Sequence, residues 1–286
     1  MKQYKISVVI PVYNEADYLR ECLESLDNQN YPAYEVIVVD NNSTDDSCKI
    51  VQEFPFVKLI REQKQGLVYA RSRGYDQAQG EIIARTDADS RLPADWLNKI
   101  NQAFNHYPDL AALSGSASYS DFYLFAKFAR KLDLVIRKYL ANKLTGYVFL
   151  FGANMAIRKT AWLKVRYQVC CLAGYHEDLD IAIHLQERNL KVKYIADLSA
   201  DVSCRRIKTS FWQFLKYCLA SPRTYKYHQL KNRKYMYLPI VLIVALFPLG
   251  YLIYASYNPK LKRLSVMFLL ANFRLKQRID PTILTD

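Results

Sequence analysis

The 286-residue sequence contains six cysteines but no Cys-x-x-Cys pair, and none of the cysteines has metal-type spacing to the four histidines. Cys170 and Cys171 are adjacent, an arrangement that does not favour a disulfide between them. These absences argue against a disulfide framework and a cysteine-rich metal centre. We therefore expect reduced thiols in a cytosolic environment, most of them buried as small hydrophobic side chains.

Acidic residues are missing from residues 202–279, a stretch that holds 15 lysines and arginines. Residues 1–201 are neutral, with 25 basic and 25 acidic residues, and the last seven residues hold two aspartates. The formal net charge of +13 therefore comes entirely from the C-terminal part, as 15 basic minus two acidic residues. This shift predicts a boundary near residue 201 and a different environment beyond it.

Charged residues of either sign are absent from residues 238–257, a run of 20 positions. The length matches the hydrocarbon core of a membrane. Tyrosines flank the run, as in an interfacial belt, and basic clusters at 231–234 and 260–263 lie on both sides, which leaves the orientation open. We expect a transmembrane or re-entrant helix, since Pro248 permits either. The alternative is a buried core helix.

The chain is therefore expected to have four parts. Residues 1–201 form a large N-terminal domain, and residues 202–237 form a basic amphipathic juxtamembrane region. The apolar helix covers 238–257, and a basic tail covers 258–286. Within this tail, residues 264–273 are too short to span a membrane and are expected to lie at its surface.

Short apolar runs rich in β-branched residues predict three strands, at 6–12, 35–40 and 80–85. Continuous apolar strands are typical of parallel sheets that are covered on both faces. Helical patterns are found at 15–29, 44–54, 66–79, 122–150 and 176–189. The β-α-β-α-β order predicts a doubly wound α/β domain, with a mostly parallel central sheet flanked by helices.

Asp87 and Asp89 follow the third predicted strand, one residue apart. An extended backbone there would point both carboxylates to the same side, where they repel unless a cation lies between them. Oxygen ligands suit Mg²⁺ or Mn²⁺, which also bind the phosphates of a substrate. The pair predicts a metal site beyond the carboxyl ends of the strands. The alternative is a solvated loop with a helix cap near Asp89 or Ser90.

Other side chains are expected at the same edge of the sheet. Asp40 ends the second strand and either accepts a hydrogen bond from a base or ribose or caps the next turn. Pro11 and Tyr13 follow the first strand and form either a wall for a base or ordinary edge packing. Arg71 lies on the predicted helix 66–79. Its side chain either reaches a diphosphate or base, or is a surface cation that points to solvent.

Six sequence words occur in an order that resembles the family-2 nucleotide-sugar glycosyltransferases, which have a GT-A fold. They are SVVIPVYNE at 7–15, VIVVDNNSTDDS at 36–47, GLVYARSRG at 66–74, GEIIARTDADS at 80–90, GANMAIRK at 152–159 and HEDLDIAIHL at 176–185. A dinucleotide oxidoreductase is disfavoured, because no Gly-x-Gly-x-x-Gly follows the first strand.

The resemblance implies a role for each matching position. The donor nucleotide would be held by Pro11, Tyr13, Glu15, Asp40, Arg71, Asp87 and Ala88. Asp89, together with Asp87, would bind Mn²⁺ or Mg²⁺. Asp178 would be the catalytic base, with Glu177 beside it. The acceptor side would be lined by Gly152, Ala153 and Asn154. On the motif alone, Glu177 and Asp178 are equally explained as favourable charges at a helix N-terminus.

The implied reaction moves a sugar from a nucleotide-diphosphate donor, UDP by default, to a hydroxyl or phosphate acceptor. A cation would neutralise the leaving nucleoside diphosphate, and one base would activate the acceptor, so a single displacement inverts the anomeric carbon. Processive members carry Gln-x-x-Arg-Trp, whereas residues 219–228 read LASPRTYKYH, which predicts a non-processive enzyme.

The basic C-terminal part implies attachment to the anionic cytoplasmic leaflet, with the catalytic domain facing the cytoplasm. The acceptor would then be a glycan or polyprenyl-phosphate-linked molecule near the membrane.

Other classes stay open at this point. A catalytically inactive binding protein could share the fold. A nucleic-acid-binding protein is suggested by the interleaved lysines and tyrosines of 205–237, but the apolar run that follows argues against a nucleic-acid partner. A nucleotidyltransferase would need a Gly/Lys/Arg-rich phosphate loop after the first strand, where this chain has the acidic PVYNEADY.

Overall fold

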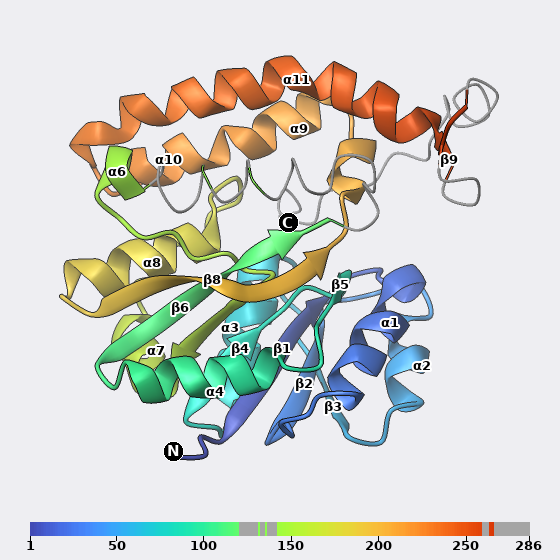
Figure 1. Cartoon of the computed structure of the whole chain (residues 1–286), viewed down its shortest axis with the longest axis vertical. Helices are drawn as coiled ribbons and strands as arrows, with labels where there is room; N and C mark the ends of the chain where they lie inside the picture. The colour runs from blue at the N-terminus through green and yellow to red at the C-terminus, as the bar shows by residue number, and fades with distance from the viewer. Residues whose placement is uncertain (120–130, 132–134, 136–141, 259–262, 266–286) are drawn as a thin grey trace.

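The computed structural model describes residues 1–119, 142–258 and 263–265, together with residues 131 and 135. Figure 1 shows a mixed sheet with helices on both faces, and a layer of C-terminal helices beyond one end of its strands. The expected helical region 122–150 lies largely outside the described residues, which include its short helix α6 (Asn142–Thr145).

Eight strands form the main sheet, in the order β3-β2-β1-β4-β7-β6-β8-β5. They are β1 (Ile6–Val12), β2 (Glu35–Asp40), β3 (Val57–Arg61), β4 (Ile82–Arg85), β5 (Ser90–Arg91), β6 (Leu110–Ser118), β7 (Met155–Arg158) and β8 (Lys191–Val202). Strands β7 and β5 run antiparallel to their neighbours, and the other six share one direction. The α/β class is therefore confirmed, with two antiparallel strands that the sequence did not predict.

The predicted strands at 6–12 and 35–40 are observed with those bounds, and the third begins later than predicted, at Ile82. All seven residues of β1 are buried, because helices cover both faces of the sheet. The helices of this part are α1 (Ala16–Asp27), α2 (Ser47–Gln52), α3 (Leu67–Gln77), α4 (Trp96–His106), α7 (Lys159–Val165) and α8 (Glu177–Glu187). Of these, α1, α2, α3 and α8 correspond to predicted helices.

The core has two halves, one on each face of the sheet. On one face, Val8 packs in a cluster with Leu23 of α1 and Trp96 of α4. On the other face, Val9 belongs to a cluster with Tyr75 of α3 and Trp162 of α7. Alternate residues of β1 thus serve opposite halves of the core, as the pleat of a strand requires.

The cysteines are all free, but most are not buried. Cys22 and Cys170 are buried, Cys171 is exposed, and the other three are half-buried. The prediction of mostly buried thiols is therefore wrong, because four of the six cysteines lie in loops or on partly solvated helix faces.

The C-terminal layer begins directly after β8. It consists of η3 (Arg205–Lys208), α9 (Phe211–Cys218), α10 (Ala220–Tyr227), η4 (Lys231–Met236) and α11 (Tyr237–Ser256), followed by the two-residue strands β9 (Tyr257–Asn258) and β10 (Arg263–Leu264). Figure 1 shows α11 running alongside α9 and α10, above the strands. The layer therefore closes the edge of the sheet at which the sequence placed its candidate residues.

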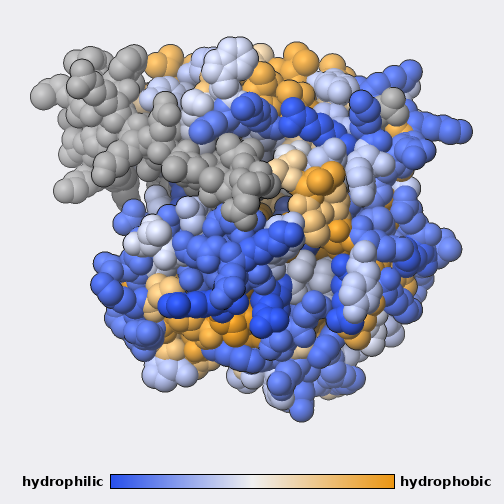
Figure 2. All heavy atoms as spheres, turned by 180° about the vertical axis from the view of Figure 1, so that it is seen from behind, coloured by the Kyte–Doolittle hydropathy of each residue, from blue (hydrophilic) through white to orange (hydrophobic). Residues whose placement is uncertain are grey.

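Helix α11 is long and apolar enough to cross a membrane, by length and composition, and only 22% of its apolar window is buried. The helix continues through Pro248 without a break. Leu238, Val241 and Leu249 are more than half exposed, and Figure 2 shows hydrophobic side chains at the top of the molecule beside hydrophilic ones. This exposure argues against a buried core helix, and the continuous helix differs from a re-entrant hairpin.

Candidate active site

A cavity of about 470 Å³ lies between the carboxyl ends of the central strands and the C-terminal layer. Its polar wall comes from the residues after β1 and β4, the segment before β7 and the start of α8. Its apolar wall comes from α9 and α11, through Phe214, Leu242, Ile243, Leu246 and Phe247. Ligands of open α/β sheets bind at this edge, so the cavity is the candidate active site.

The fold brings most of the sequence-predicted residues to this cavity. Those that line it are Pro11, Tyr13, Glu15, Asp87, Ala88, Asp89, Gly152, Ala153, Glu177 and Asp178. Those that do not line it are Asp40, Arg71 and Asn154. All six sequence words therefore contribute to the lining of one cavity, although they are far apart along the chain, and the words at 36–47 and 66–74 do so through Asn41, Leu67 and Ala70.

Arg85, the last residue of β4, is a buried cation between two carboxylates. Its Nη1 donates to Glu177 Oε1 at 2.6 Å, and its Nη2 donates to Asp87 Oδ1 at 3.2 Å. Burial alone would raise the pKa of Glu177, but the charges of Arg85 and Arg71 lower this pKa instead. Glu177 therefore stays ionised and fixes the start of α8 against the end of β4.

Asp178 lies on the first turn of α8 with its carboxylate held by two backbone groups. The N–H of Gly152 donates to Oδ2 at 2.9 Å, and the N–H of Leu179 donates to Oδ1 at 2.8 Å. Burial and the negative charge of Glu177 raise the pKa of Asp178. Position 152 has no room for a side chain, because a Cβ there would lie 2.7 Å from the Arg85 guanidinium. The oriented carboxylate with a raised pKa has the properties of a general base.

Asp87 and Asp89 lie in a turn, in which the Ser90 N–H donates to the Asp87 carbonyl at 3.1 Å. The extended backbone that the sequence argument assumed is therefore not observed. Both aspartates still reach the cavity, but each faces a different cation, Arg85 for Asp87 and Arg205 for Asp89.

Arg205 of η3 connects the C-terminal layer to the acidic wall of the cavity. Its Nε donates to Asp89 Oδ2 at 2.5 Å, and its Nη2 donates to Glu15 Oε1 at 2.6 Å. The guanidinium also lies over the Tyr18 ring, 4.4 Å from the ring centroid. The side chains of Asp89, Glu15 and Arg205 are all nearly buried. These carboxylates offer oxygen ligands, the donor set of Mg²⁺ and Mn²⁺, and a positive charge already lies beside them.

Asp40, Arg71 and Asn154 support the cavity from behind in this structure. Asp40 Oδ1 accepts from the Ser43 N–H at 3.1 Å, which is its turn-capping alternative. Arg71 is completely buried, and its Nη1 donates to the Glu177 carbonyl at 3.3 Å. Asn154 Oδ1 accepts from Trp96 Nε1 at 2.8 Å. A direct contact of these three side chains with a ligand stays a prediction.

Two of the cations that line the cavity, Arg85 and Arg205, bind its carboxylates and were missed by sequence reasoning. Arg85 lies two residues before Asp87, and an arginine at the end of an otherwise apolar strand is a usable signal of a buried ion pair. Arg205 has no such local signal, because it is one of many basic residues after position 201. Its role depends on partners that are 116 and 190 positions away in the chain.

The family profile described as Glycosyl transferase family 2 matches residues 7–180. The chain belongs to glycosyl transferase family 2. The resemblance drawn from the six sequence words is thereby confirmed, and the sheet with its flanking helices is a GT-A fold.

Two curated glycosyltransferases match part of the chain. Glycosyltransferase AglE of Haloferax volcanii is 40% identical over 101 residues, which are 33% of this chain and 33% of AglE. Dolichol-phosphate mannosyltransferase of Pyrococcus furiosus is 37% identical over 113 residues, which are 37% of this chain and 32% of that enzyme. The chain thus matches about a third of the length of these relatives.

Solved glycosyltransferase structures share the fold. Mannosyltransferase PcManGT from Pyrobaculum calidifontis, in complex with GDP-Man and Mn²⁺, has a TM-score of 0.63 at 18% identity, covering 98% of this chain and 78% of that chain. TarS 1–349 from S. aureus, in complex with UDP-GlcNAc, has a TM-score of 0.53 at 18% identity, covering 76% of this chain and 65% of that chain. At these identities the likeness establishes the architecture.

Proposed function

We propose that this family-2 member is an inverting, non-processive glycosyltransferase that moves a sugar from a nucleotide-diphosphate sugar to a membrane-proximal acceptor. The observation that carries the proposal is one cavity in which Asp87 and Asp89 lie on the strand side and Asp178 at the start of α8. A cation site and a base are the two groups that such a transfer needs.

The donor is proposed to lie against Pro11, Tyr13 and Glu15, with its diphosphate toward Asp89. Asp89 and Asp87 would hold Mn²⁺ or Mg²⁺, since both are carboxylates and both line the cavity. When bound there, the cation would offset the charge of the leaving nucleoside diphosphate. PcManGT binds GDP-Man and Mn²⁺, which supports a divalent cation as the partner of this wall.

Asp178 is proposed to remove the proton from an acceptor hydroxyl. Its two backbone hydrogen bonds fix the carboxylate, and the Arg85–Glu177 pair fixes the turn that carries it. Proton removal by one base and displacement by one nucleophile inverts the sugar, since no enzyme carboxylate takes part as a nucleophile. A phosphate acceptor would need no base, because it is already ionised at neutral pH.

The acceptor is proposed to carry a hydrocarbon chain, as in a polyprenyl phosphate or a lipid-linked glycan. The apolar wall formed by α9 and α11 faces the same cavity as the acidic residues. One of the relatives is a dolichol-phosphate mannosyltransferase, which supports this class. The exposed apolar side of α11 and the basic residues of the layer suit attachment to an anionic leaflet, with the catalytic domain in the cytoplasm.

Calorimetry on the detergent-solubilised chain tests the proposal with UDP, GDP and dTDP, each with and without Mn²⁺. We expect metal-dependent binding of one nucleotide, with UDP as the default, and an affinity loss of at least about tenfold in Asp89→Ala. Asp109→Ala, which removes an exposed partner of Lys191, is the matched control and should bind like the wild type. A folded protein that binds none of the three nucleotides would sink the transferase proposal.

A further inference from the structure

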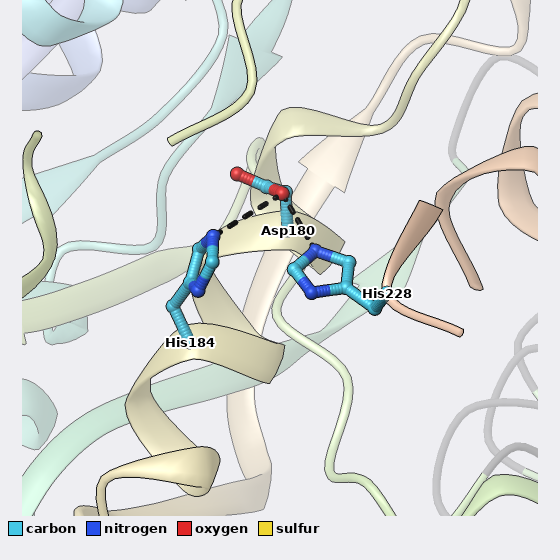
Figure 3. Close-up of side chains that lie close together, drawn as sticks. All are labelled: Asp180, His184 and His228. Carbon is cyan, nitrogen blue, oxygen red and sulfur yellow. Dashed lines mark hydrogen bonds and ion pairs between the residues drawn. The ribbon is translucent and has the colours of Figure 1, made fainter. Parts of the chain in front are cut away.

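Three polar side chains meet outside the cavity, at the junction of α8 with the C-terminal layer. Asp180 and His184 are one turn apart on α8, and His228 directly follows α10. Figure 3 shows both imidazole rings directing a nitrogen at the Asp180 carboxylate. His228 Nε2 lies 2.7 Å from Asp180 Oδ1, and His184 Nε2 lies 3.7 Å from the same oxygen. The three ligand atoms all lie within 4.8 Å of one another.

The cluster is buried and carries a charge that needs a counter-charge. The Asp180 side chain is 0% exposed, that of His228 is 5% exposed and that of His184 is 13% exposed. The other carboxylate oxygen, Oδ2, is occupied by the Cys170 N–H at 2.8 Å. A buried carboxylate is stabilised by a metal ion or by a protonated partner, and two imidazoles beside it permit either.

We propose that Asp180, His184 and His228 form a second metal site, specific for a Zn²⁺-type ion and separate from the cation site at Asp89. Two imidazole nitrogens and one carboxylate oxygen are a donor set that favours Zn²⁺ over Mg²⁺ and Mn²⁺. Zn–ligand bonds of about 2.0–2.1 Å place tetrahedral ligand atoms roughly 3.3 Å apart. The two Asp180–histidine separations of 2.7 and 3.7 Å need to change by less than an ångström to reach this geometry. The two histidine nitrogens, which lie within 4.8 Å of each other, need to approach by up to about 1.5 Å.

Glu187 completes the arrangement from the outer side of the two rings. Its carboxylate oxygens lie 3.6 Å from His184 Nδ1 and 4.0 Å from His228 Nδ1. Metal-bound histidines ordinarily donate their second N–H to a carboxylate, which fixes the tautomer and leaves Nε2 for the metal. At these distances the contacts with Glu187 are longer than hydrogen bonds, but the Nε2 atoms face Asp180 and the Nδ1 atoms face Glu187, which is the polarity that a zinc site favours.

The site would cross-link the catalytic domain to the C-terminal layer. Asp180 is two residues beyond Asp178, so its helix carries the proposed base. A neighbouring contact joins the same elements, since the His176 N–H donates to Thr224 Oγ1 of α10 at 3.0 Å. A zinc ion here would therefore hold α10, and with it the apolar wall, against the start of α8.

Metal analysis of the tag-free, full-length protein in detergent tests the proposal after dialysis against a weak chelator and a defined zinc buffer. We expect one equivalent of zinc in the wild type and in Asp89→Ala, which lacks the other cation site. In His228→Gln and in His184→Gln we expect the zinc to be lost. Glutamine at position 228 can still donate a hydrogen bond to Asp180, so this variant keeps the polar contact while it removes the imidazole ligand.

Two further readouts distinguish a metal from a proton. Co²⁺ loaded in place of zinc should give the intense visible bands of a tetrahedral site in the wild type and not in His228→Gln. Zinc should raise the melting temperature of the wild type and leave that of His228→Gln unchanged. Equal zinc content in the wild type and in both folded histidine variants would overturn the proposal. So would a wild-type protein that holds no zinc, whether or not it is stabilised when the pH falls through the histidine range.

Discussion

At the residue scale, the site depends on arginines that separate its carboxylates. Arg85 holds Glu177 and Asp87 apart from inside the core, while Arg205 holds Asp89 and Glu15 from the C-terminal layer. Four acidic side chains around one cavity would otherwise repel each other. The two guanidinium groups therefore let the protein keep a strongly acidic wall before any ligand arrives.

Arg85→Ala should destabilise the protein by about 3–5 kcal/mol, because it leaves Glu177 buried without its counter-charge. Urea unfolding followed by circular dichroism measures this loss. Arg91→Ala is the matched control: the Arg91–Glu21 pair is about half exposed, and its removal should cost less than about 1 kcal/mol. Equal losses for the two variants would contradict the structural role given to Arg85.

Glu177→Gln should move the acid limb of the pH–rate profile to lower pH. A base works above its own pKa, and the pKa of Asp178 is raised by its burial and by the charge of Glu177. Removal of that charge, with Arg85 left beside the site, lowers the pKa of Asp178, so the base stays ionised further into the acid range. Hydrolysis of the nucleotide sugar from pH 4 to 8 measures the shift; a limb that moves to higher pH would exclude Asp178 as the titrating base.

At the element scale, the sequence predicted the strands that are continuous apolar runs. It missed the strands whose place in the sheet depends on pairing with distant segments. The apolar runs that became β1 and β2 are almost completely buried, and their only polar residues are Ser7 and the two end residues of β2, Glu35 and Asp40. Strand β6, LAALSGSAS, consists largely of small residues, and β8 interleaves charged and apolar ones. Their place in the sheet, like the antiparallel direction of β7, is decided by contacts between distant segments.

The candidate site divides in the same way. Motif residues that follow strands, such as Asp87 and Asp89, were found because the carboxyl ends of strands are where α/β sheets bind ligands. Arg205, His184 and His228 were not found, because each acquires its role only when the C-terminal layer folds back over the domain. Cysteine and histidine spacing also failed to indicate the second metal site, since His228 lies 48 positions after Asp180 in the chain.

Helix α11 should bind anionic membranes through its exposed apolar side. Leu238, Val241 and Leu249 are 73%, 65% and 55% exposed, and each leucine or valine contributes about 1.5–3 kcal/mol when fully buried. Changing all three to serine should therefore reduce flotation with anionic vesicles by more than tenfold, while nucleotide binding is kept. Leu163→Ser, at an exposed apolar position on α7, is the control and should float like the wild type. Unchanged flotation of the triple variant would place the membrane contact elsewhere.

At the scale of the whole molecule, the cavity has two walls from two parts of the chain. The acidic wall belongs to the domain that matches family 2, and the apolar wall belongs to the layer beyond the family match, which ends at residue 180. The expected division at residue 201 falls at the last residues of β8. The region 202–237, proposed as juxtamembrane, also contributes residues such as Arg205 and Phe214 to the lining of the cavity. The loss of acidic residues after position 201 therefore marks the change from the acidic wall to the apolar wall of one cavity.

Arg205→Gln should increase the affinity for Mn²⁺ in the absence of nucleotide, because a cation must displace the guanidinium from Asp89 and Glu15. Titration calorimetry should show an increase of several-fold relative to the wild type. Arg206→Gln, one residue further along η3, is the control for the loss of a positive charge, and it should have the smaller effect. A weaker Mn²⁺ affinity in Arg205→Gln would contradict this competition. It would mean that Arg205 holds Asp89 and Glu15 in the positions in which they bind the cation.

The bond between Arg205 and Asp89 also has a thermodynamic consequence that is independent of the sugar. If a free cation and a tethered guanidinium compete for one carboxylate, metal binding and release of the tether share one coupling free energy. Any event that draws η3 away from the cavity must then tighten metal binding, and metal binding must favour that movement by the same factor. The metal affinity of the catalytic domain would thus depend on the position of the C-terminal layer.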